Sequence, residues 1–274
     1  MLDNFQLIPG EAFTAIGSLG EKLIDKLSDA VGFIATPKGN RKNIIEAEQF
    51  LIDQIKADDG KPYIQKAAEI SNARRLIREY NNQNDIVNIA IQNLGEDAMP
   101  ENIDVGWLAY FMDQAKNISA EDMQIIWGKI LAEECEDDVP KTLINSLSLI
   151  GRNEAENFRK LCCFCVKCSN KKIPVIFLDE LYEIYTQNGI SIDAINDLQA
   201  LGLVCMSSAG YTEHFDKDGC EIEYFDNKQT FPDNERVDRI RTGHVILTKS
   251  GEKLSNIIEY EEIKGFWDFV HKRL

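Results

Sequence analysis

Cysteine is the residue type whose spacing in this chain most directly suggests chemistry. Cys162, Cys165 and Cys168 are separated by two residues each, so two Cys-x-x-Cys pairs overlap within seven positions. Such pairs ligate zinc or take part in thiol–disulfide exchange. A zinc site takes a second ligand pair from another segment, and neither Cys205, Cys220 nor the histidines have a matching spacing. We favour the alternative that these cysteines are small apolar side chains on a buried helix face, and we expect no metal.

The sequence contains none of the motifs that identify common enzyme active sites. A glycine-rich dinucleotide motif, a phosphate-binding G-x-x-x-x-G-K-[ST] motif, H-E-x-x-H and G-x-S-x-G are all missing. The three histidines, His214, His244 and His271, are scattered, which leaves few candidates for a general base. We therefore expect a non-enzymatic protein with no catalytic residues and no cofactor.

Two charged clusters each admit a functional and a structural interpretation. Arg74, Arg75 and Arg78 form a compact arginine group, which could contact phosphate or could be a solvated helix face paired with nearby glutamates. Five carboxylates in residues 133–138 could bind a hard cation, but their spacing does not match a calcium-binding loop. We favour a solvated helix face for the arginines and a solvated acidic loop for the carboxylates.

The overall charge and composition bound the class of protein. The chain has 274 residues and a net charge of −16, which opposes binding to nucleic-acid phosphates over most of its surface. Seven cysteines and the lack of a signal peptide predict reduced thiols and a cytoplasmic location. No window is apolar enough to span a membrane. Residues 11–36 come closest to a membrane-contacting helix, but charged residues interrupt the apolar run.

The stretch 104–132 has the strongest helical pattern in the chain. Its apolar residues recur at three- and four-residue steps in two runs, which predicts two antiparallel helices with Trp107, Phe111 and Trp127 between them. Ser119 is expected to cap the second helix. The three rings are candidates for the core, or for a partner-binding patch if they are exposed.

The rest of the N-terminal part also has helical periodicity. Further helices are expected at residues 12–31, 40–57, 62–94, 140–151 and 153–170. Within the third of these, residues 81–84 predict a break, because asparagine competes for backbone hydrogen bonds. We therefore expect a helical N-terminal domain over residues 1–170.

Residues 171–274 are expected to form a second domain of mixed structure, so that the fold class is mainly α with a small α+β C-terminal part. Helices are predicted at 174–187, 191–203, from 250 and at 266–270, with strands at 204–207, 211–215, 221–225 and 243–248. This order resembles a winged-helix module. The helix at 191–203 carries Asp193 and Asp197 and no basic residue, so contact with protein is favoured over contact with DNA.

The runs DVGWLAYFMDQAKNISAEDMQIIWGKILA, NEAENFRKLC and HVILTKSGEKL together resemble a family of uncharacterised bacterial proteins with a domain of unknown function. This family is in turn similar to abortive-infection alpha-type proteins, which have a short sequence motif like the one at residues 126–132 of this chain. The resemblance extends from about Gly17 to Leu254. It implies a setting in phage defence and no catalytic residues. We expect a cytoplasmic protein that acts through contacts with a protein partner or a second copy; a DNA-binding regulator and a cysteine–metal protein are the alternatives.

Overall fold

The computed structural model describes residues 17–36, 41–168, 171–178, 182–214, 220–231 and 239–273. The chain divides into two compact units, Met1–Asp138 and Val139–Leu274. The first unit is helical where it is described, and the second combines helices with two small sheets. The prediction of a mainly helical chain with a small sheet region in the C-terminal half is therefore confirmed.

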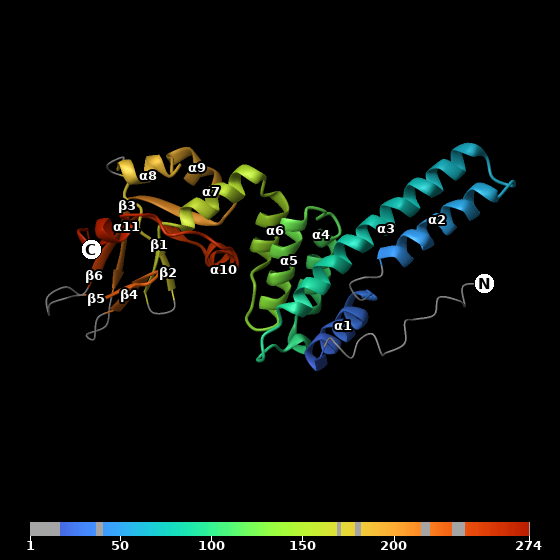
Figure 1. Cartoon of the computed structure of the whole chain (residues 1–274), viewed down its shortest axis with the longest axis horizontal. Coiled ribbons are helices and arrows are strands. Elements are labelled where there is room, and N and C mark those ends of the chain that lie inside the picture. The colour runs from blue at the N-terminus through green and yellow to red at the C-terminus, as the bar shows by residue number, and fades with distance from the viewer. Residues whose placement is uncertain are drawn as a thin grey trace. The chain divides into compact units, whose positions relative to one another are not determined.

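A long helix organises the first unit. The elements are α1 (Gly17–Val31), α2 (Arg41–Ala57), α3 (Tyr63–Gln92), the short 3-10 helix η2 (Pro100–Asn102), α4 (Val105–Ala115) and α5 (Glu121–Glu134). Figure 1 shows α2 alongside the first half of α3, and the second half of α3 packs on α4 and α5. Residues 12–16 of the predicted first helix lie outside the described residues.

The pair α4 and α5 confirms the two helices predicted at 104–132. The ring centroids of Trp107 and Phe111 are 5.1 Å apart, and those of Phe111 and Trp127 are 5.2 Å apart. All three residues are buried, so the rings form the core of the first unit. The cap of α5 was predicted wrongly, because the helix begins one residue later than expected and Ala120, not Ser119, occupies the N-cap position.

The helix α3 is continuous through the asparagine run, so the predicted break is wrong. The side chain of Asn82 donates to the carbonyl oxygen of Lys116 at 2.8 Å. Asn84 accepts from the backbone N–H of Thr36 at 2.7 Å, and Asn88 donates to the carbonyl oxygen of the same residue at 2.9 Å. Because tertiary contacts engage the side chains of Asn82 and Asn84, these two amides do not compete for the hydrogen bonds of their own helix. Asn88 also donates to the carbonyl oxygen of Asn84 at 2.8 Å, and the helix continues through this bond.

The second unit consists of six helices and six strands among the residues that the structure describes. They are α6 (Lys141–Leu149), α7 (Arg152–Cys162), β1 (Cys165–Cys168), β2 (Lys171–Pro174), α8 (Glu183–Gln187), α9 (Ile192–Ala200), β3 (Val204–His214), β4 (Cys220–Tyr224), β5 (Asn227–Phe231), β6 (Arg239–Leu247), α10 (Lys249–Ile257) and α11 (Phe266–His271). One antiparallel sheet has the order β2-β1-β4-β5, and β3 pairs with β6 in a two-stranded ribbon.

The cysteine run is not one helix, as the periodicity had predicted. Instead α7 ends at Cys162, and Cys165 and Cys168 lie on strand β1, which is hydrogen-bonded to β2 on one side and β4 on the other. The helical spacing of the cysteines was therefore misleading, because strand pairing with segments distant in sequence decides the local structure. The predicted helix at 174–187 is likewise shorter, since its described helical part is Glu183–Gln187.

The division between the units falls after Asp138, whereas the sequence pattern placed it after residue 170. The difference arises from packing, because α6 contacts α10 and α7 contacts α9. Both helices therefore belong to the same unit as the strands that follow them. None of the described helices combines the length and the apolar character needed to cross a membrane.

Candidate functional site

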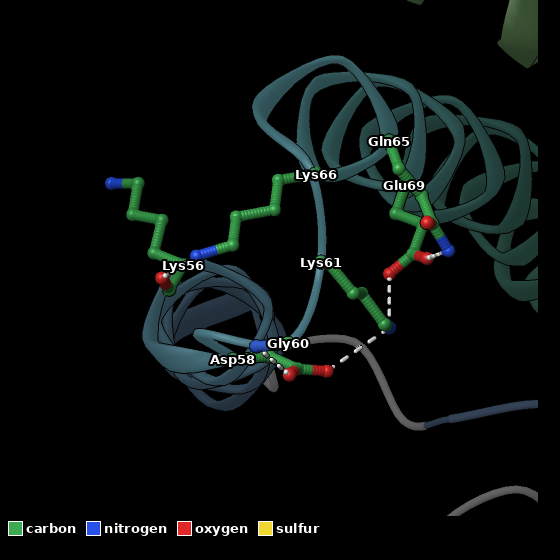
Figure 2. Close-up of polar contacts among 7 residues, drawn as sticks. All are labelled: Lys56, Asp58, Gly60, Lys61, Gln65, Lys66 and Glu69. Atoms are coloured by element: carbon green, nitrogen blue, oxygen red, sulfur yellow. Dashed lines mark hydrogen bonds and ion pairs between the residues drawn. The ribbon is translucent and has the colours of Figure 1, made fainter.

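The turn between α2 and α3 is held by charged side chains at the end of a helical hairpin (Figure 2). The carboxylate of Asp58 accepts from the backbone N–H of Gly60 at 3.1 Å. The Lys61 Nζ lies 2.7 Å from Glu69 Oε2 and 3.5 Å from Asp58 Oδ2. The hydrogen bond between Lys61 and Glu69 raises the pKa of the ammonium and lowers the pKa of the carboxyl. These contacts join the turn to the first part of α3.

We define the hairpin as residues 41–80, which are α2, the turn and the first part of α3. Thirteen large hydrophobic residues are exposed among the residues that the structure describes, and six of them lie in this segment: Ile45, Phe50, Leu51, Tyr63, Ile64 and Leu76. The exposed fractions of Phe50, Tyr63 and Ile64 are 65%, 87% and 77%. The hairpin is therefore the part of the described chain where exposed apolar surface is concentrated.

Helical geometry explains why the hairpin cannot bury Phe50 and Ile64 itself. The seam between α2 and α3 contains the buried residues Ile52 and Ala73. Phe50 precedes Ile52 by two residues, and Ile64 precedes Ala73 by nine, so each lies about 180–200° around its helix from the seam. Both side chains consequently point away from the neighbouring helix.

The arginine group predicted from the sequence lies on this hairpin. Arg75 pairs with Glu79 at 3.0 Å along the same helix, and Arg74 lies 3.7 Å from Glu48 on α2. Arg78 is exposed. Two of the three guanidinium groups thus have carboxylate partners within the hairpin, which supports the solvated helix face over a phosphate contact.

The hairpin also differs from the rest of the chain in net charge. Residues 41–80 contain eight Lys and Arg and seven Asp and Glu, which gives a net charge of +1. Since the whole chain has a net charge of −16, the other 234 residues have a net charge of −17. The structure shows ion pairs joining the two helices or stabilising each one, such as those of Lys61 and Arg75. The exposed apolar surface is therefore set on a segment whose charges largely balance.

Cys162 and Cys165 are buried and carry free thiols, and Cys168 takes part in a disulfide bond. The prediction of reduced thiols is therefore wrong for Cys168, which lies on a strand that pairs with the sequence-distant β4. Burial raises the pKa of Cys162 and Cys163, so these thiols stay protonated and are poor nucleophiles. Within the described ranges, no group of three or more His, Cys, Asp and Glu side chains is placed to hold a metal ion.

A cavity of about 430 Å³ lies in the second unit, between the end of α7, the turn after α8 and residues 261–263. The guanidinium of Arg159 at its wall forms an ion pair with Glu156 at 3.0 Å, and Lys160 lies beside it. The thiol of Cys163 also lines the cavity, but burial raises its pKa. The cavity therefore lacks an activated thiol.

The single histidine buried among the described residues has a structural role in the second unit. His244 Nδ1 accepts from the backbone N–H of Leu178 at 2.9 Å, and its Nε2 lies 3.1 Å from a guanidinium nitrogen of Arg241. Both ring nitrogens are thus engaged, and the ring links β6 to the segment that precedes α8. This arrangement gives no reason to assign the imidazole to proton transfer.

The sequence pattern did not single out Phe50, Tyr63 or Ile64. The sequence did contain a sign that Phe50 and Ile64 are exposed, because both lie outside the apolar stripes of their helices. The aromatic residues singled out instead, Trp107 and Trp127, are buried.

Comparisons with known proteins give one match. No curated protein and no solved structure matches the chain. Residues 69–271 match a family whose members are described as having no known function, and this segment includes most of α3 and all the elements from α4 to α11. Since the match covers well over half of its length, the chain belongs to the family described as "Protein of unknown function (DUF2806)".

Proposed function

We propose that this protein is non-enzymatic and acts through protein contacts, and that the hairpin carries the contact surface. The concentration of exposed apolar side chains on residues 41–80 supports the proposal. Exposed apolar side chains concentrated on one segment are costly to leave in water, and such a concentration is typical of a protein–protein contact surface. The match to the family begins at residue 69, so α2 and the tip of the hairpin are additional to the family segment.

The alternative of a DNA-binding regulator finds less support. The order α8, α9, β3, β6 with α10 following is compatible with a winged-helix-like arrangement, in which α9 would be the recognition helix. The exposed positions of α9 include Asp193, Asn196 and Asp197, and the helix contains no Lys or Arg. Carboxylates on that face would repel DNA phosphates. A winged-helix-like unit used for protein contact is the proposal that fits this charge.

Photo-crosslinking in living bacteria tests whether the hairpin touches another protein. Benzoylphenylalanine would replace Phe50 or Ile64, and Leu149, which is 68% exposed on α6, would be the matched control position. We expect crosslinked protein from the two hairpin positions and little from the control. Equal crosslinking at all three positions would reject the hairpin as the contact surface.

The resemblance to abortive-infection proteins motivates phage defence as the setting. Plaque assays would compare bacteria that lack the gene with bacteria that carry it together with its neighbouring genes. We expect protection against some phages, and we expect the substitutions Phe50→Glu and Ile64→Glu together to abolish it. Identical sensitivity with and without the gene across diverse phages would remove phage defence from the proposal and leave the contact function to be judged by crosslinking.

A further inference from the structure

We propose that the cavity beside the end of α7 binds a small zwitterion of the free amino acid class, with its carboxylate on Arg159 and Lys160 and its ammonium on Glu261. The site lies wholly within the second unit, so this inference does not depend on the contact surface proposed for the hairpin. It depends on the size of the cavity, on the charges of its walls and on the acceptors that those walls leave free.

The cavity has three walls that come from separate segments of the second unit. Its volume of about 430 Å³ lies within the range of roughly 300–1,000 Å³ that is usual for small-molecule sites. The end of α7 forms one wall, residues 186–189 form the second and residues 261–263 form the third. The Tyr224 hydroxyl joins the first wall to the third, because it donates to the Cys163 carbonyl oxygen at 2.9 Å and accepts from the Ile263 N–H at 2.8 Å. The cavity is therefore preformed on these two sides.

The wall formed by α7 presents positive charge. The Glu156 carboxylate accepts from two nitrogens of Arg159 at 3.1 and 3.0 Å, and it lies 3.8 Å from the Nζ of Lys160. One carboxylate thus serves two cations, which leaves one positive charge in excess. The other terminal nitrogen of Arg159 has no partner among the residues that the structure describes, so it can donate to the carboxylate of a ligand.

The wall at residues 261–263 presents negative charge. Glu261 and Glu262 both line the cavity and are exposed. Asn227 donates to the Glu262 carboxylate at 3.5 Å, whereas in the described part of the chain no hydrogen bond or ion pair engages the Glu261 carboxylate. This carboxylate can therefore accept from the ammonium group of a ligand.

The two charged walls do not neutralise each other. Glu156 most strongly, and Glu261 more weakly, raise the pKa of Arg159, so the charge of Glu261 is felt across the cavity. Within the described ranges, however, no ion pair joins Arg159 to Glu261. Opposite charges that share a cavity without touching match a ligand that carries both charges. A ligand of a single sign would be attracted by one wall and repelled by the other.

The remaining wall offers further acceptors for an ammonium group. The amide nitrogen of Gln187 donates to the Glu183 carboxylate at 2.9 Å, and that of Asn188 donates to the Ile184 carbonyl oxygen at 2.7 Å. Both amide groups are thus oriented by bonds within their own turn, and their oxygens remain as acceptors. A few polar groups that converge on a cavity are what fixes the orientation of a small ligand.

Saturation-transfer NMR of the full chain with the common L-amino acids identifies a binder, and titration of the strongest one measures its dissociation constant. We expect a dissociation constant of about 1 mM or lower. The N-acetyl derivative of the same amino acid lacks the ammonium charge and its methyl ester lacks the carboxylate, so each should bind at least about tenfold more weakly. Absence of binding by every amino acid at about 10 mM, or equal binding of the three forms, overturns the proposal.

Charge variants locate the binding in the cavity. Lys160→Gln and Glu261→Gln should each raise the dissociation constant by about tenfold, because each removes one charged contact. Lys171→Gln and Glu213→Gln are the matched controls, since they remove the same charges from an ion pair of the same unit that does not line the cavity. The controls should bind like the wild-type chain. Equal weakening in both sets, or no weakening in the cavity set, overturns the proposal.

A steric pair gives an independent test. Thr186 and Ser148 are both exposed on helices, and each hydroxyl donates to the carbonyl oxygen three residues earlier, but only Thr186 lines the cavity. Thr186→Trp should abolish binding and Ser148→Trp should leave it unchanged, with circular dichroism showing that both variants are folded. A folded Thr186→Trp protein that binds normally overturns the proposal. If that variant does not fold, the charge variants decide.

Discussion

Trp127 offers a sharp test of how the core of the first unit is held together. The residue is completely buried on α5, and its ring centroid lies 5.2 Å from that of Phe111. Its indole Nε1–H has no acceptor among the residues that the structure describes. A buried donor without a partner costs about 1–3 kcal/mol, so this tryptophan stabilises the core through its size while its N–H opposes stability.

Substitutions at this position separate the two contributions. Trp127→Ala removes nearly the whole ring and should lower the free energy of unfolding by about 3–5 kcal/mol. Trp127→Phe removes about three heavy atoms, a loss of roughly 1–2 kcal/mol, and also removes the unsatisfied donor. We therefore expect Trp127→Phe to lie within about 1 kcal/mol of the wild-type protein, and Trp127→Leu to lie between the other two variants.

Hydrogen exchange of α5 is the suitable assay, because a chain with two compact units need not unfold in one step. Protection of α5 amides in the Phe variant should remain close to that of the wild-type protein and should fall steeply in the Ala variant. A Phe variant as unstable as the Ala variant would refute the reasoning, since it would show that the indole N–H contributes favourably.

Three further predictions concern other buried groups. Gly243→Ala should destabilise the second unit by about 3 kcal/mol in a thermal melt, because φ is +112° and a Cβ would lie 2.1 Å from the Ile176 carbonyl oxygen. Gly202→Ala is the control, since a Cβ there has open space around it, and it should destabilise the unit less. Tyr224→Phe should cost about 2 kcal/mol in the same melt, since its hydroxyl donates to the Cys163 carbonyl and accepts from the Ile263 N–H. Burial raises the pKa of Cys135 from 9.0 to about 12, so this thiol ionises in the unfolded chain at a lower pH than in the folded chain. The urea concentration at the unfolding midpoint of the first unit should therefore decrease as the pH rises from 9.0 to about 12, and Cys135→Ala should make this decrease smaller.

Much of the first unit could be predicted from the sequence because its helices bury apolar stripes of period 3.6. The two helices around Trp107 and Trp127 are the clearest example, since local spacing alone determines which faces meet. The asparagine run in α3 could not be predicted in this way. The side chains of Asn82 and Asn84 form hydrogen bonds with the backbone of Lys116 and Thr36, which are 34 and 48 residues away. A local sequence pattern does not indicate partners at that distance.

The helix predicted over the cysteine run was wrong for a related reason. Cys162, Cys165 and Cys168 fall at steps that fit a helix, yet the chain leaves α7 at the first of them and enters β1. Strand β1 is the second strand of a four-stranded sheet, and its neighbour β4 begins more than fifty residues later. Short segments with apolar residues on every side are ambiguous between helix and buried strand, and distant pairing resolves the ambiguity.

The hairpin shows that residues outside the apolar stripe of a helix carry information that local periodicity does not use. The apolar stripes of α2 and α3 predict one seam, and that seam forms with Ile52 in it. Phe50 and Ile64 lie outside both stripes, and a helix that needs only one seam gains nothing in the single chain from large apolar groups on its far side. Local periodicity treats such residues as exceptions to the pattern. They lie exposed on a segment of net charge +1 within a chain of −16, which is why we propose this segment as a contact surface.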